Sequence, residues 1–70
     1  MKYAVIYEKT DTGYSAYLPD LPGCVAAAAT LAETEQLMKE AVVLHLAGMR
    51  SDGELIPVPT TITGYVSQGT

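Results

Sequence analysis

Only one stretch of this sequence has the pattern of a long helix, and that stretch constrains the rest of the fold. From Leu31 to about Arg50 the apolar residues recur at helical spacing. Thr30 and Glu33 form a capping box, in which the hydroxyl accepts from the Glu33 amide and the carboxylate reaches the Thr30 amide. A lone amphipathic helix must bury its apolar stripe against another element, so the preceding segments are expected to form a sheet. The stripe contains Leu31, Met38, Ala41, Val42 and Met49, and is widened by Leu37 and Leu44.

Three short segments before the helix have the composition and alternation of strands. They are residues 2–9, 14–18 and 24–28, with a turn at residues 10–13, where Gly13 is expected to adopt a positive φ. A last strand is expected at residues 60–67, beyond an extended segment that contains two prolines. The order β-β-β-α-β predicts one α+β domain over residues 1–70, a two-layer domain with one helix packed on a small, mostly antiparallel sheet.

The chain has little material for a core. It contains 70 residues, no Trp, no Phe and a single Cys, so no internal disulfide can form. Ordering the chain costs about 1.5 kcal/mol of conformational entropy per residue. For so small a core, this cost is close to the free energy that burial of apolar side chains supplies. We therefore expect a homo-oligomer, either a dimer or a tetramer.

The charge balance indicates the kind of partner. Four basic and eight acidic residues give a net charge of -4, which argues against a nucleic-acid binder and favours a basic partner. The lone Cys and the absence of a signal-peptide pattern indicate the cytoplasm. No apolar run approaches the roughly 20 residues that span a membrane.

Catalytic interpretations of the sequence are weak. Glu8, Asp11 and Asp20 are the candidate ligands of a Mg²⁺-dependent nuclease, but each position also suits an ordinary turn or strand end. His45 has no strong partner one helical turn away, and Cys24 has no second Cys or His for zinc. No phosphate loop or dinucleotide motif is present. We expect no catalytic residue, metal site or cofactor, and interpret His45 and Cys24 as structural.

A rigid loop connects the second and third expected strands. We interpret this PDLPGC motif as a corner that ends one strand and begins the next, while a role at a binding edge stays open. Its residues are Pro19, Asp20, Leu21, Pro22, Gly23 and Cys24.

Together with several other short motifs, this loop resembles the HicB family of antitoxins. The resemblance extends from residue 1 to about residue 60. The matching positions, in order, are Gly13-Tyr14 with Ala16, the PDLPGC motif, Thr30, Glu40-Ala41, Leu44-His45-Leu46, Gly53, Ile56-Pro57 and Pro59.

The resemblance implies a partial ribonuclease-H-like domain without catalytic activity. It also implies a partner, HicA, a small basic toxin that cleaves mRNA and whose catalytic His and RNA surface the antitoxin covers. The hypothesis is thus a cytoplasmic, non-enzymatic antitoxin of a type II toxin–antitoxin system. The alternative is an orphan HicB-like module that forms homo-oligomers and has no toxin partner.

Many HicB proteins continue into a C-terminal DNA-binding domain. The last eight residues, TGYVSQGT, have neither the length nor the cations for one, so direct DNA binding is not expected. The resemblance assigns no partner-binding residue.

Overall fold

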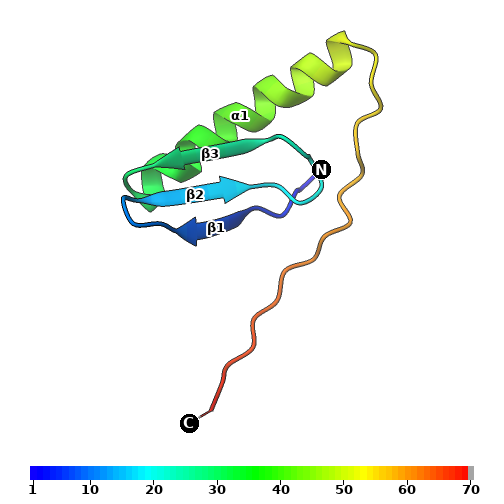
Figure 1. The fold of residues 1–70 in the computed structure, drawn as a ribbon. Helices are drawn as coiled ribbons and strands as arrows, with labels where there is room; N and C mark the ends of the chain where they lie inside the picture. The colour runs from blue at the N-terminus through cyan, green and yellow to red at the C-terminus, as the bar shows by residue number, and fades with distance from the viewer. Residues whose placement is uncertain (70) are drawn as a thin grey trace.

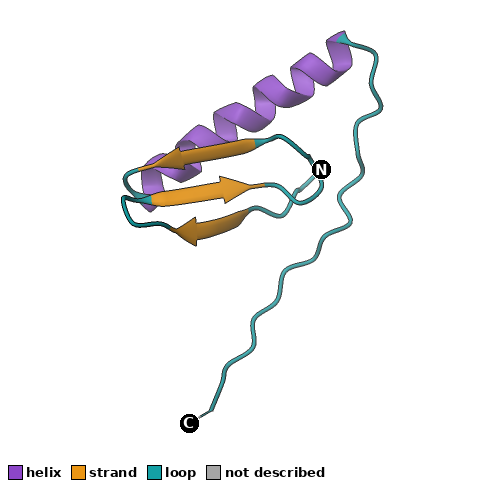
Figure 2. Cartoon of the chain, viewed as in Figure 1, coloured by secondary structure: helices purple, strands orange, loops and turns teal. Residues whose placement is uncertain are grey.

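The computed structural model describes residues 1–69, in which three strands precede one helix (Figures 1 and 2). The strands are β1 (Ile6–Lys9), β2 (Tyr14–Tyr17) and β3 (Val25–Ala28), and the helix is α1 (Leu31–Ser51). The sheet is antiparallel throughout, with the order β1-β2-β3. The predicted α+β class is therefore confirmed, as is the packing of one helix on a small antiparallel sheet.

The turn between β1 and β2 depends on a glycine for a reason that the sequence did not predict. The Thr10 amide donates to the Gly13 carbonyl at 2.8 Å, and the Gly13 amide donates to Thr10 Oγ1 at 3.0 Å. The predicted positive φ at Gly13 is wrong, since Gly23 and Gly53 are the glycines with positive φ in residues 1–69. Gly13 is instead constrained by space, because a Cβ at this position would lie 2.1 Å from the Ala28 carbonyl oxygen.

Side-chain and backbone hydrogen bonds define both ends of α1. Thr30 Oγ1 accepts from the Glu33 amide at 3.1 Å, as predicted, whereas the Glu33 carboxylate accepts from the Thr30 hydroxyl rather than from its amide. At the other end, the Gly53 amide donates to Arg50 O and the Glu54 amide to Met49 O, which is a Schellman motif. Gly53 has the positive φ of 73° that this motif requires.

The core is small and lies between α1 and the face of β2 and β3 that α1 covers. Its buried hydrophobic residues are Ala16, Leu18, Leu21, Cys24 and Met38. Leu44 is 73% exposed and Leu37 is also exposed, so the predicted widening of the helix stripe toward these residues is wrong. The reason is that α1 packs mainly against β2 and β3, which leaves the side of the helix that carries Leu37 and Leu44 uncovered.

One predicted strand limit and one predicted strand need correction. β1 begins at Ile6 rather than at residue 2, although Tyr3 and Val5 still pack against the core. Residues 60–67 form no strand, and in Figure 1 this orange-to-red segment runs on past the sheet without joining it. The β-favouring side chains are present, but composition alone does not determine a pairing partner, and residues 60–67 do not pair with β1.

Candidate functional site

The PDLPGC motif forms a tight corner between β2 and β3. The Leu21 amide donates to Leu18 O at 3.2 Å, and the Cys24 amide donates to Leu21 O at 3.1 Å. The Leu18 amide donates to Cys24 O at 3.3 Å, which closes the corner. Gly23 adopts a φ of 86°, a backbone conformation that strains any residue with a Cβ.

Two side chains of the corner point into the core. Leu21 is fully buried, and Cys24 is almost so, next to the buried Leu18 and Met38. Burial raises the pKa of the Cys24 thiol, which lowers the fraction of reactive thiolate at neutral pH. These contacts support the interpretation of Cys24 as a packed side chain.

Asp20 has a role that the sequence analysis did not predict. Its carboxylate accepts four hydrogen bonds, from the amides and hydroxyls of Thr60 and Thr61, at 2.9–3.1 Å. These residues lie 40 and 41 positions further along the chain. We call this set of bonds the Asp20 clamp. It fastens the segment that follows α1 to the corner.

Neutralising Asp20 should release Thr60 and Thr61. The hydrogen bonds from Thr61, and then those from Thr60, hold the pKa of Asp20 below its usual range. The clamp is therefore complete above the ordinary Asp pKa and is lost as pH falls through the lowered value. We expect Asp20→Asn to accelerate amide exchange at both threonines at neutral pH, because the Asn side chain has one accepting oxygen in place of two and carries no charge.

Amide hydrogen exchange resolved by NMR measures this effect. Asp11→Asn is the matched control, since Asp11 lies in the β1–β2 turn, away from the clamp. In a pH titration of the wild type, the NMR chemical shifts of the same amides should change with an inflection below pH 3.8, the ordinary pKa of an Asp carboxyl. Unchanged exchange at Thr60 and Thr61 in Asp20→Asn would contradict the clamp.

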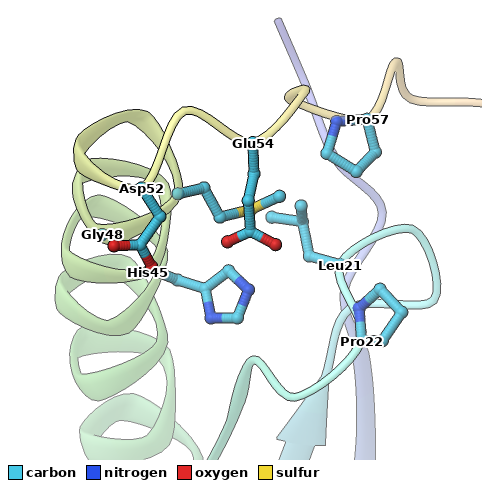
Figure 3. A pocket seen from close by; sticks show the side chains of 8 residues that line it. Leu21, Pro22, His45, Gly48, Asp52, Glu54 and Pro57 are labelled. Atoms are coloured by element: carbon cyan, nitrogen blue, oxygen red, sulfur yellow. The ribbon is translucent and has the colours of Figure 1, made fainter.

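A cleft of about 520 Å³ lies between the corner and the end of α1 (Figure 3). The His45 ring and the Glu54 carboxylate both point into it, and Leu21, Pro22 and Pro57 form the opposite side. Glu54 lies beyond the end of α1, so the positions one helical turn from His45 do not include it. The cleft places one ionisable ring near acidic groups, which is too little for nucleophilic or metal chemistry.

The three carboxylates of the nuclease hypothesis do not come together. Glu8 lies on β1, Asp11 lies in the turn before β2, and Asp20 lies beyond the other end of β2. Within residues 1–69, no group of three His, Cys, Asp or Glu side chains is placed to hold a metal ion. The described part of the chain therefore offers this hypothesis no site.

The face of the sheet opposite α1 carries a row of apolar side chains. Ile6 pairs with Tyr17, and Tyr17 pairs with Val25, so the three side chains lie side by side across the sheet. Tyr17 is exposed and Val25 is 65% exposed. Glu8 lies on the same face, two residues from Ile6. We call this surface the open sheet face, and an apolar row beside a carboxylate is the kind of surface that binds proteins.

The fold and this face define a small α+β domain with a surface suited to binding another polypeptide. The chain belongs to the HicB_like antitoxin family of bacterial toxin–antitoxin systems, whose family model matches residues 3–70. This membership confirms the resemblance that the PDLPGC motif and the helix indicated. Among residues 1–69, no helix has the length and apolar character needed to cross a membrane.

The chain is also similar to two curated proteins and to one solved structure. An uncharacterized 14.9 kDa protein of Haemophilus phage HP1 is 40% identical over 68 residues, and the chain spans only 51% of its length. A UPF0150 protein of Archaeoglobus fulgidus is 41% identical over 61 residues, which is 88% of its length. A solved structure described as a HicA3 and HicB3 toxin–antitoxin complex contains a chain with 30% identity and a TM-score of 0.74. The match covers 86% of this chain and 70% of that one.

Proposed function

We propose that this protein is a non-enzymatic antitoxin that acts in the cytoplasm by binding and neutralising a HicA-like mRNA interferase. The observation that carries the proposal is the fold match to a chain of the HicA3 and HicB3 toxin–antitoxin complex, at 30% identity. Membership of the HicB_like antitoxin family supports the same role. The exposed apolar side chains of the open sheet face offer a surface through which such a protein could cover its toxin.

The open sheet face is the proposed contact surface for the toxin. Ile6, Tyr17 and Val25 would supply apolar area that is removed from water on binding, and aromatic side chains such as Tyr17 are frequent in interface cores. The net charge of -4 would speed the encounter with a basic toxin, and Glu8 places one negative charge on the face itself. Covering the RNA-binding surface of the toxin would then suppress cleavage.

Replacing Val25 with Arg tests both the function and the surface. Val25→Arg puts a cation on a face proposed to meet a basic partner, so we expect its Kd for the toxin to rise about 10- to 100-fold. Because Val25 is largely exposed, the variant should fold. The measurement is titration calorimetry with a small basic HicA-like toxin, together with an assay of RNA cleavage.

Val43→Arg is the matched control. Val43 is 67% exposed, close to the 65% of Val25, but it lies on α1, outside the open sheet face. It should bind and inhibit like the wild type. Equal effects of the two variants would reject the open sheet face as the contact surface. A wild-type protein that neither binds the toxin nor suppresses cleavage would reject the antitoxin role and favour the orphan module.

A further inference from the structure

The segment that follows the Asp20 clamp has the properties of a strand without a sheet. Residues 62–66 have the sequence ITGYV, in which Ile, Thr, Tyr and Val all favour strands. Ile62, Tyr65 and Val66 are each more than 90% exposed. Burial of such side chains is favourable, and an extended backbone leaves its amides and carbonyls without partners.

The start of this segment is held in a defined place. The Asp20 clamp fixes Thr60 and Thr61, and the Tyr3 hydroxyl donates to the Pro57 carbonyl a few residues earlier. The chain therefore leaves the domain at a defined point, and the segment runs past the sheet from there (Figure 1). Pre-positioning of this kind lowers the entropy lost when the segment binds.

β1 offers the matching partner. It is an edge strand, so every second residue directs its amide and carbonyl away from β2. The segment passes β1 of its own chain without pairing, and a groove of about 330 Å³ lies between them. Val5, Ile6 and Tyr7 line one side of this groove, and residues 61–65 line the other.

We infer that residues 62–66 of one molecule pair as a strand with the free edge of β1 in a second copy of this chain. A two-fold axis would make the exchange reciprocal, so that each segment enters the groove of the other copy. In that groove the entering segment lies between β1 and residues 62–66 of the other copy. The backbone groups along both of its edges then have hydrogen-bond partners. The exchange joins the two small sheets into one. It is independent of the proposed antitoxin role.

Proline scanning with mass measurement tests the exchange. Size-exclusion chromatography with light scattering should give the wild type a mass of twice 7.4 kDa. Thr63→Pro removes one amide from the middle of the paired segment, and we expect it to weaken the dimer by about 100-fold or more. The far-ultraviolet circular dichroism should keep its helical signal, since residues 62–66 lie outside α1 and the core. Gln68→Pro, just beyond the segment, is the matched control and should stay dimeric.

Isotope-filtered NMR on a mixture of labelled and unlabelled protein identifies the contact itself. Nuclear Overhauser effects between residues 62–66 of one copy and residues 5–9 of the other would establish the exchange. Three results would overturn it: a monomeric wild type, a dimer that Thr63→Pro leaves intact, or effects that arise only within one chain. Toxin binding enters none of these readouts, so failure here is separate from failure of the proposed function.

Discussion

Gly13→Ala is expected to destabilise the domain by about 3 kcal/mol or more, although it adds only one carbon atom. That atom would lie 2.1 Å from Ala28 O and 2.8 Å from Ala29 Cα. Both neighbours belong to the backbone at the end of β3, so no side-chain rotation can make room. The turn after β1 would have to move away from β3, and the hydrogen bonds of the sheet would be distorted.

Gly48→Ala is a matched control with the opposite expected sign. Nothing outside its own helix lies within 4 Å of a Cβ built at Gly48, which lies inside α1. Alanine should therefore stabilise α1 by up to about 1 kcal/mol. Urea unfolding at one fixed protein concentration measures both variants. Equal and small effects of the two substitutions would contradict the close approach of the turn to β3.

Leu21→Ala is expected to cost about 2–5 kcal/mol, because it removes a fully buried side chain from the corner and leaves a cavity. A domain of this length has a total stability of only about 3.5–10 kcal/mol. The substitution therefore removes much of that stability, and a large fraction of the variant should be unfolded at 37 °C. No other side chain of the PDLPGC motif is as deeply buried as Leu21.

Leu44→Ala makes the same chemical change at an exposed position of α1. With 73% of its surface exposed, Leu44 should contribute no more than about 0.5 kcal/mol. Thermal unfolding followed by circular dichroism at matched concentrations compares the two variants. If Leu21→Ala unfolds at the wild-type temperature, the corner is not part of the cooperative core.

Features set by neighbouring residues could be predicted from the sequence. The capping Thr30 and the residues around Gly53 place the ends of α1 to within about one residue, because helix ends depend on local hydrogen bonds. The three strands were predicted from alternation, which reports which face is buried. Their exact limits could not be predicted, because the alternation already begins in residues 2–5, before the first paired residue of β1.

Features set by distant residues could not be predicted. The need for glycine at position 13 comes from β3, and the four bonds of Asp20 come from residues 40 positions away. Nothing in the local sequence connects Asp20 with the adjacent Thr60 and Thr61. The prediction of a strand at residues 60–67 was wrong for the single chain for a related reason. The composition of this segment favours strand pairing but does not determine which strand it pairs with.

The interpretation of the whole PDLPGC motif as structural stays a prediction. The burial of Leu21 and Cys24 and the positive φ of Gly23 support it, and the Leu21 and Asp20 variants will test it. The alternative role at a binding edge takes an indirect form, because the motif itself is not the edge of a sheet. Through Asp20 the motif positions residues 62–66, which we expect to pair with the edge strand of a second copy.

The Asp20 clamp also determines how the domain carries mechanical load. A pull on residues 62–69 is transmitted first to Thr60 and Thr61, and from them through Asp20 into the corner between β2 and β3. The next attachment along the chain is the bond from the Tyr3 hydroxyl to the Pro57 carbonyl, so the load reaches α1 only after both sets of bonds have broken. Resistance to unfolding from this end therefore depends first on a few side-chain hydrogen bonds, and not on the helix that forms the longest element of the fold.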